Sequence, residues 1–309
     1  MRRLKAKDII YTTHVESVSN WTWAFCKQFV KLVHAPTLLL PTSDMRPSAA
    51  VFAKLAINDV FLLDPTKSKK VFEHCEIEKV MKTMGYVIGV DPYTKVLDDN
   101  RRMVNQLGRA RREEKSQKRH EMKIDQCAGH FLQLCGFDDD PFDITAEGAD
   151  FKIFGKVCHS VGDHYVVVTP SNDLVLVFED KSLEDGQLIE KRGHLGQIVG
   201  ELLQMLSLNR DNNTFRNVFA VRFVNYRVTA FRVEPCSETL ATLCDTDRVP
   251  TSKIKLMCTE KTPQKHLGLS LIDQEERLKA LQIMADMRRF ILTRKFPYRT
   301  KKMNAFRVS

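Results

Sequence analysis

An aspartate, a glutamate and a lysine stand at the two ends of one predicted β-hairpin. Asp163 opens a strand-like run, and Glu179 and Lys181 close a second run after a Pro-Ser-Asn-Asp sequence that is typical of a turn. Two neighbouring carboxylates can share a divalent cation, and a lysine beside them can orient an attacking water or help to deprotonate it. The hairpin therefore predicts the groups that a metal-dependent nuclease needs.

Strand alternation decides which of the acidic residues can act together. Glu179 and Lys181 point to one face of their strand, whereas Asp180 points to the other. Of two neighbouring registers, one places Asp163 opposite Asp180. The other places Asp163 opposite Glu179, with Cα atoms about 4.5 to 5.5 Å apart. In that second register we expect Asp163 and Glu179 to hold Mg²⁺ (or Mn²⁺), with the backbone carbonyl of Asp180 as a further oxygen.

Length and composition indicate a folded protein without a membrane span. At 309 residues and 43% hydrophobic, the chain can bury one large core or two moderate ones. No apolar run approaches the roughly 20 residues that cross a bilayer, so we expect no membrane partner. The cysteines are scattered without a Cys-x-x-Cys pair, which favours reduced thiols in an intracellular compartment and argues against a zinc site.

Positive charge is concentrated in two segments. The chain carries +9 overall, but residues 101–119 carry +6 and residues 288–307 carry +8, so the remainder is acidic. Such segments suit a polyanion and favour the nucleus over the cytoplasm, although solvated helix faces and a disordered tail would look the same. The candidate nucleic-acid contacts are Arg109, Arg112, Lys115, Arg119, Arg222, Arg227, Arg294, Lys295, Lys301 and Lys302. Arg222, Arg227 and Arg232 either line a phosphate groove or share an exposed strand face.

The chain divides into three predicted regions. Residues 1–100 are expected to be mainly helical, with amphipathic patterns at 21–33 and 52–57, and to offer a surface for a protein partner or a homodimer. Residues 101–240 form the predicted core, and residues 241–309 hold a helix at 271–293 and a basic tail. Within the core we expect a helix from about 100 to 135 that Gly136 ends, strands at 151–158, 163–169 and 174–181, a helix at 193–206, and strands at 217–223 and 227–234.

This order of elements carries a family resemblance. A helix, three strands bearing Asp and then Glu-x-Lys, a helix and a further strand resemble the PD-(D/E)XK phosphodiesterase superfamily, whose restriction-endonuclease-like fold has an αβββαβ core. The resemblance covers residues 113–234, roughly 40% of the chain. It implies an α/β fold with Asp163 and Glu179 as metal ligands and Lys181 as the catalytic lysine. The organisation also looks somewhat similar to the nuclease modules of Crinkler-type effectors.

The resemblance extends to residues on the two flanking helices. Many members carry a glutamine on the helix after the hairpin, which Gln197 matches, and an acidic residue on the helix before it, which Glu121 matches, with Glu113 and Glu114 as competitors. Glu121 falls on the apolar face of its helix, where an unpaired carboxylate is costly, so it would have to point into a site. The chain has Gly162 where the family has proline.

Other polar residues near the hairpin are interpreted more simply. Glu201, one turn beyond Gln197, is expected to be a solvated helix residue, although it could reach the same site. His159, His164 and His194 are expected to lie on the surface or behind the ligands.

Three functions are compatible with these patterns. The first is a Mg²⁺-dependent nuclease that acts on DNA more readily than on RNA. The second is a protein that keeps the fold without turnover and serves as a nucleic-acid-binding or scaffold component of a nucleoprotein assembly. The third is an unrelated α/β protein whose Glu-x-Lys is accidental.

Overall fold

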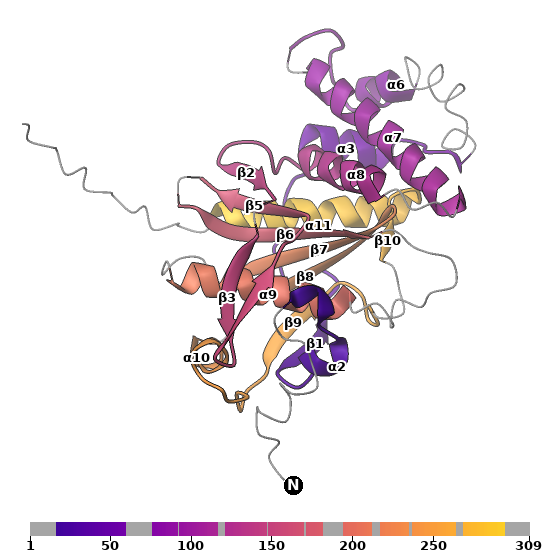
Figure 1. The fold of residues 1–309 in the computed structure, drawn as a ribbon. Coiled ribbons are helices and arrows are strands. Elements are labelled where there is room, and N and C mark those ends of the chain that lie inside the picture. Colours follow the sequence, from indigo (N-terminus) through magenta and orange to yellow (C-terminus); the bar gives the residue numbers. More distant parts are fainter. Residues whose placement is uncertain are drawn as a thin grey trace, which may run out of the picture.

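The chain has a mixed α/β fold in which helices cover both faces of one large sheet (Figure 1). The computed structural model describes residues 17–59, 76–91, 93–116, 121–146, 148–169, 171–181, 194–211, 217–234, 237–263 and 268–293. Within these ranges, no helix combines the length and the apolar character needed to span a bilayer. The cysteines of the described ranges are buried free thiols.

The sheet runs in the order β1, β9, β8, β7, β6, β5, β2, and β10 pairs with β8. Pairing is parallel between β1 and β9 and between β6 and β7, and antiparallel elsewhere. The strands are β1 (Val30–His34), β2 (Phe142–Thr145), β5 (His164–Val168), β6 (Asp173–Lys181), β7 (Val218–Val224), β8 (Arg227–Val233), β9 (Ile254–Cys258) and β10 (Leu269–Ser270). The strands β3 (Ala149–Ile153) and β4 (Lys156–Ser160) form a separate hairpin.

The register of β5 against β6 decides the geometry of the predicted site. His164 pairs with Phe178, so Asp163 lies beside the residue that follows Phe178, which is Glu179. This is the second of the two registers considered above. A bulge interrupts this pairing. Val166 pairs with Leu176 but Val167 pairs with Leu174, so β6 carries one extra residue between them. The bulge leaves the alternation at Glu179, Asp180 and Lys181 intact.

One face of the sheet is covered by a layer of helices on the side of Asp180. These helices are α3 (Pro47–Lys54), α6 (Glu76–Thr83), α7 (Tyr93–Ser116), α8 (Glu121–Leu134) and α11 (Gln274–Thr293). The helical pattern from about 100 to 135 therefore forms two helices that pack against each other, and Gly136, with a φ of 81°, follows the second. Phe131 of α8 packs its ring against Phe178 and Phe223 of the sheet.

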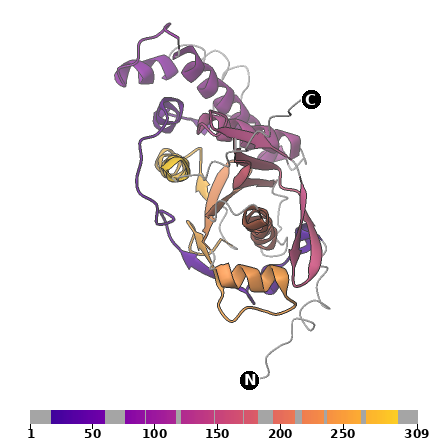
Figure 2. The ribbon, with the colours of Figure 1, turned by 90° about the vertical axis from the view of Figure 1, so that its left-hand side faces the viewer.

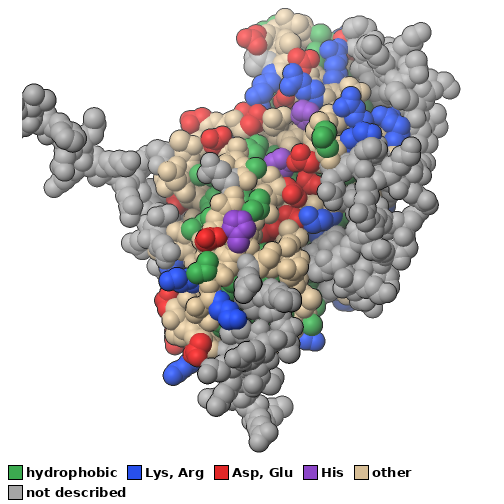
Figure 3. All heavy atoms as spheres, in the orientation of Figure 1, with side chains coloured by type: hydrophobic (Ala, Val, Ile, Leu, Met, Phe, Trp, Pro, Cys, Tyr) green, Lys and Arg blue, Asp and Glu red, His purple; other side chains and the backbone are tan. Residues whose placement is uncertain are grey.

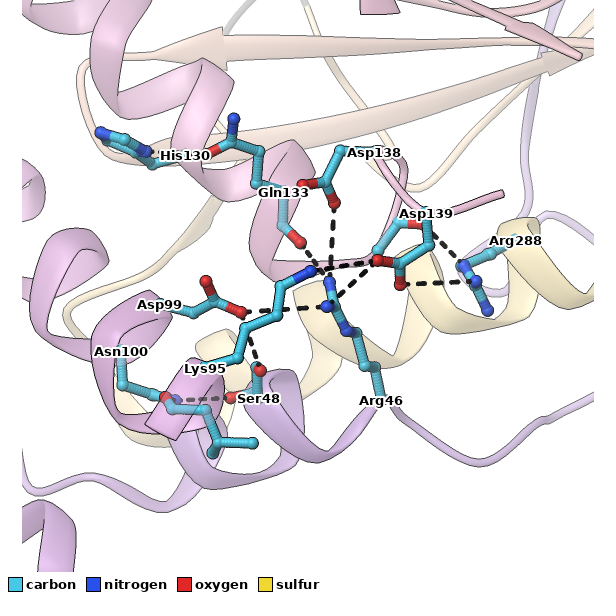
Figure 4. Close-up of polar contacts among 12 residues, drawn as sticks. Arg46, Ser48, Lys95, Asp99, Asn100, His130, Gln133, Asp138, Asp139 and Arg288 are labelled. Atoms are coloured by element: carbon cyan, nitrogen blue, oxygen red, sulfur yellow. Dashed lines mark hydrogen bonds and ion pairs between the residues drawn. The ribbon is translucent and has the colours of Figure 1, made fainter. Parts of the chain in front are cut away.

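Arg46 joins several members of this helical layer (Figure 4). Its guanidinium lies at the start of α3, donates to the carbonyl of Gln133 over 2.6 Å, and pairs with Asp139 at 3.3 Å. Asp139 in turn pairs with Lys95 of α7 at 3.3 Å and with Arg288 of α11 at 3.8 Å. These contacts fix the end of α8, and hence the helix that flanks the β5–β6 hairpin.

The opposite face is covered by α9 (His194–Asp211), which packs against β6 and β7. Figure 2 shows α9 nearly end-on, enclosed by the sheet, by the β3–β4 hairpin and by α10 (Ser237–Asp245). The short helices η1 (Val18–Asn20) and α2 (Trp23–Cys26) pack on α9 as well, through an aromatic group built around Trp21, Phe25 and Phe29. Glu179 and Lys181 face this side of the sheet.

Several predicted elements need correction. Residues 21–33, predicted as one helix, form α2 and then β1, because residues 30–34 pair along β9. Residues 151–158, predicted as one strand, turn back at Phe154 and Gly155, which both have positive φ, into the β3–β4 hairpin. On the side away from β6, β5 pairs with β2, a strand that the sequence pattern did not indicate. The predicted role of residues 1–100 in binding a partner stays a prediction.

Two glycines let the N-terminal segment approach α9. A Cβ at position 196 would lie 2.1 Å from the carbonyl oxygen of Trp21, and one at position 200 would lie 2.3 Å from a methyl carbon of Val18. A side chain at either position would push the segment off the helix, because backbone and a β-branched residue cannot yield. Gln197 and Glu201 lie next to these two glycines, so the same contacts hold the predicted site residues of α9 in place.

Gly196→Ala is therefore expected to destabilise the protein by about 3 kcal/mol, the upper end of the usual cost of overpacking. Gly129→Ala on α8 is the matched control, since its Cβ would meet only the His164 ring at an ordinary 3.8 Å. The control should be neutral or slightly stabilising, because alanine favours a helix by about 1 kcal/mol over glycine. Urea unfolding of both variants checks this, and equal midpoints would refute the account of the α9 contact.

Candidate active site

Asp163, Glu179 and Lys181 come together where β5 begins and β6 ends. Lys181 Nζ contacts Glu179 Oε1 and lies 3.9 Å from Asp163 Oδ2. Asp163 Oδ2 also accepts a hydrogen bond of 2.7 Å from the backbone N–H of Asp180, which holds the aspartate across the end of β6. The side chain of Glu179 is fully buried, whereas that of Asp163 is 35% exposed, so solvent reaches the group from the side of Asp163.

Helix α9 adds Glu201 and Gln197 to the same group. Gln197 Nε2 donates to Glu201 Oε1 over 3.0 Å, one helical turn away. Glu201 is fully buried rather than solvated, which corrects the simpler interpretation of this residue. Burial raises its pKa well above the usual range, and the charge of Glu179 raises it further. The neutral form of the Glu201 carboxyl is therefore favoured at a higher pH than that of an exposed glutamate.

Burial and charge act in opposite directions on the other ionisable groups. Burial raises the pKa of Glu179 to about 7; Lys181 opposes this rise, whereas the charge of Asp163 adds to it. For Lys181, burial lowers the pKa, but the charges of Glu179 and Asp163 outweigh it and the pKa ends above its ordinary value. Lys181 is consequently an ammonium at neutral pH.

A hydrogen-bond network fixes the loop that carries Asp163. The hydroxyl of Tyr165 accepts from the backbone N–H of Gly162 at 2.9 Å and donates to Gln204 Oε1 of α9 at 2.6 Å. A Cβ at position 162 would lie 2.7 Å from Val177 and 2.9 Å from the Tyr165 ring. Glycine is thus required where the resembled family has proline, since proline would also remove the N–H that binds Tyr165.

Tyr165→Phe is expected to cost about 1 to 3 kcal/mol of stability, because it leaves the N–H of Gly162 and the amide oxygen of Gln204 without their partner. Tyr86→Phe serves as the control, since the half-buried Tyr86 donates its backbone N–H to the carbonyl of Met81 but its hydroxyl makes no hydrogen bond within the described residues. Its effect should stay within about 0.5 kcal/mol. Thermal or urea unfolding measures both, and an unchanged Tyr165→Phe variant would contradict the network.

A second group of ionisable side chains lies on the other face of β6, beneath α8. Asp180, His164 of β5 and Asp125 of α8 have ligand atoms within 4.8 Å of one another. Burial raises the pKa of Asp180 to about 8, and the charges of Asp163 and Asp125 add to this. The sequence analysis did not predict this group. It correctly placed Asp180 on the opposite face of the strand from Glu179, but it expected His164 to lie on the surface or behind the ligands. The alternation that separated Asp180 from Glu179 could have suggested it.

The predicted acidic ligand on the helix before the sheet is not placed. Glu121 begins α8, but its side chain and those of Glu113 and Glu114 lie outside the described residues. Asp125, one turn after Glu121 on α8, has its carboxylate near His164 and Asp180 at the end of the hairpin.

The predicted nucleic-acid contacts have different outcomes. Arg109 is exposed on α7 and Arg112 is half-buried. Arg222 is fully buried: its guanidinium donates to the carbonyl of Pro263 at 2.8 Å and to Thr229 Oγ1 at 3.1 Å. The prediction that Arg222 lines a groove is therefore wrong, and Arg232 is buried in the same way. The remaining candidates, namely the side chain of Lys115 together with Arg119, Arg294, Lys295, Lys301 and Lys302, lie outside the described residues.

Arg227 lines an open cleft of about 690 Å³ near the same end of the sheet. Its guanidinium lies 4.4 Å from the centre of the Tyr226 ring, and that of Arg111 of α7 lies 5.3 Å from it. The backbone N–H of Asn225, in the turn before β8, donates to the carbonyl of Lys181 over 3.1 Å. The two arginines are thus tied to the strand end that carries the lysine.

The surface reflects this distribution of charge. Figure 3 shows acidic side chains gathered near a histidine in the middle of one face, with lysine and arginine side chains above them over the helical layer. A polyanion that reaches the acidic group would meet these basic side chains beside it.

The comparisons with known proteins give no family for the chain. No family model matches the sequence, and no curated protein is similar enough to count as a relative.

Proposed function

We propose that the chain is a metal-dependent nuclease that hydrolyses phosphodiester bonds, in DNA more readily than in RNA. The observation that carries this proposal is the meeting of Asp163, Glu179 and Lys181 at one end of the β5–β6 hairpin. The donor set suits Mg²⁺ or Mn²⁺, because both prefer oxygen ligands. The carboxylate of Glu179 is buried beside Lys181 and Glu201, where a bound cation would offset the cost of its charge.

The order of the elements supports membership in the PD-(D/E)XK superfamily. Helix α8, strands β2, β5 and β6, helix α9 and strand β7 follow one another as in an αβββαβ core, with β7 parallel to β6 and a helix on each face. The β3–β4 hairpin is then an insertion between the first two core strands.

In this proposal the side chains divide the work of hydrolysis. Water forms a new bond to phosphorus, the phosphodiester P–O bond breaks, and the departing oxygen takes a proton. A cation held by Asp163 and Glu179 would lower the pKa of the attacking water and stabilise the departing oxygen. Lys181, an ammonium at neutral pH, would orient the water and offset the phosphate charge rather than remove a proton. Gln197 donates a hydrogen bond to Glu201, and Glu201 shares a side-chain hydrogen bond with Glu179.

Nucleic acid is proposed as the substrate because basic side chains flank the site. Arg111 and Arg227 line the cleft at the end of the sheet, and Arg109 is exposed on α7. Phosphate contacts of this kind bind the backbone without reading the bases. Nothing in the site points to recognition of a base sequence.

One observation favours a second candidate, a protein that binds nucleic acid without cleaving it. Lys181 already contacts Glu179, and the backbone N–H of Asp180 already occupies Asp163 Oδ2. If this closed arrangement persisted in the presence of metal, the chain would keep the fold as a scaffold in a nucleoprotein assembly.

Incubation of the purified chain with labelled duplex DNA, single-stranded DNA and RNA separates the two candidates. The nuclease proposal predicts cleavage with Mg²⁺ or Mn²⁺ that EDTA stops, with DNA cut faster than RNA. Binding without cleavage under every metal condition would favour the scaffold. Cleavage that persists in EDTA would overturn the proposed role of the metal.

A further inference from the structure

The second ionisable group has the composition of a metal site. It combines two carboxylates and one imidazole from three elements that are separate in the sequence: Asp125 from α8, His164 from β5 and Asp180 from β6. The side chain of Asp125 is 46% exposed and that of His164 is 18% exposed, so an ion has a path from solvent. Asp180, the third member of the group, is only 5% exposed.

His164 and Asp125 are already in direct contact. His164 Nε2 lies 2.8 Å from Asp125 Oδ1, and the two form an ion pair when the imidazole is protonated. This contact keeps two ligand atoms side by side, and a carboxylate oxygen of Asp180 lies within 4.8 Å of both. Two ligands at about 2.1 Å from an octahedral ion would lie about 3.0 Å apart.

Asp180 supplies the second, independent observation. Its Oδ2 is buried and has no hydrogen-bond partner within the described ranges. A buried carboxylate without a partner raises the free energy of the folded state, and a bound cation would offset this cost.

We propose that Asp125, His164 and Asp180 bind a divalent transition-metal cation, at a site separate from Asp163 and Glu179. An imidazole among the ligands favours such a cation over Mg²⁺, which prefers oxygen ligands alone. The ion would join α8 to the β5–β6 hairpin on the face of β6 that Glu179 and Lys181 do not use. This inference does not rest on the proposed hydrolysis, because it concerns binding and the other face of the strand.

Mn²⁺ is a suitable probe, because electron paramagnetic resonance counts the bound ion and pulsed measurements detect a coordinated imidazole nitrogen. The full chain, freed of metal with EDTA, is expected to bind Mn²⁺ with a nitrogen coupling. Asp125→Asn and His164→Gln should bind this ion at least tenfold more weakly, and His164→Gln should lose the coupling. Asp125→Asn changes a half-exposed residue, so it tests the site even if His164→Gln fails to fold.

Two further variants make the result specific. His159→Gln is the matched control, since it removes the exposed histidine that is hydrogen-bonded to Asp150, and it should bind Mn²⁺ like the original chain. Glu179→Gln should keep the nitrogen-coupled ion, whatever it does to cleavage. The proposal is overturned if the original chain binds no nitrogen-coupled Mn²⁺, if Asp125→Asn binds it unchanged, or if His159→Gln abolishes it. Nitrogen-coupled binding without any nuclease activity would contradict the proposed nuclease function and leave this metal site supported.

Discussion

Lys181→Ala is expected to lower the rate of Mg²⁺-dependent cleavage by about 10²- to 10⁴-fold, while nucleic-acid binding stays within about threefold. The reason is that Lys181 is an ammonium held beside both proposed metal ligands, so its removal takes away a preorganised charge at the reacting phosphate. It also leaves Glu179 buried without the cation that opposes the rise of its pKa, which favours the protonated carboxyl and weakens the metal site. Single-turnover cleavage of labelled DNA and a filter-binding assay measure the two effects.

Two variants control for that outcome. Lys95→Ala removes a lysine whose side chain is 53% exposed and which pairs with Asp139 at 3.3 Å. Asp139 lies near the turn of the hairpin, at the opposite end from Lys181, so this variant should leave cleavage unchanged. Lys181→Arg keeps the charge but not the shape of the ammonium, so it should retain metal binding and recover only part of the rate. Full activity in Lys181→Ala would exclude Lys181 from the reaction.

Arg277→Met is expected to destabilise the protein by about 3 to 5 kcal/mol, a large share of the roughly 5 to 15 kcal/mol of a typical domain. Arg277 is fully buried on α11, and burial lowers its pKa to about 10 despite the nearby charge of Asp273. Its guanidinium donates to the backbone carbonyls of Phe52, Leu55, Leu271 and Ile272. Methionine fills similar space but leaves these carbonyls without donors, at about 1 to 3 kcal/mol for each that water cannot reach.

Arg289→Met, on the exposed side of the same helix, is the matched control and should change stability by less than about 0.5 kcal/mol. Urea unfolding at neutral pH measures both variants. Equal midpoints for the two would show that the carbonyls around Arg277 find other partners, and that this arginine does not hold α11 against α3.

Local patterns predicted the elements nearest the site. The turn between β5 and β6, the apolar stripe of α9 and the β7–β8 hairpin can each be identified within about 20 residues, because alternation and helical periodicity are local properties. Gly136 marked the end of α8 for the same reason. The placement of Asp163 beside Glu179 was one of two registers that the sequence left open, and the bulge between Val166 and Val167 is part of what selects it.

Pairing between distant segments could not be predicted in this way. Residues 30–34 become a strand because β9 offers an edge, and nothing within the apolar run separates that outcome from a helix. Arg222 and Arg232 were assigned to the surface because arginine usually lies there. Their acceptors, the carbonyls of Pro263 and Leu38, stand 41 and 194 residues away in the chain.

The same distinction applies to the site. Glu201 was expected to be solvated because its neighbours in α9 do not reveal that the helix buries it against Glu179. The group of Asp125, His164 and Asp180 depends on how α8 packs across the hairpin, which no single segment encodes. Gly162 looked like a departure from the family pattern until Tyr165 and Val177 were seen to fill the space around it.

A crystal of the chain soaked with Mn²⁺, with anomalous scattering recorded at a wavelength where manganese scatters strongly, tests the central claim most directly. The account predicts a peak between the carboxylates of Asp163 and Glu179 that disappears in Glu179→Gln. A peak confined to Asp125, His164 and Asp180 would keep the second site and contradict the proposed catalytic one. An absence of density beside Asp163 and Glu179, in crystals that bind Mn²⁺ elsewhere, would contradict the claim that these residues hold the metal of a nuclease.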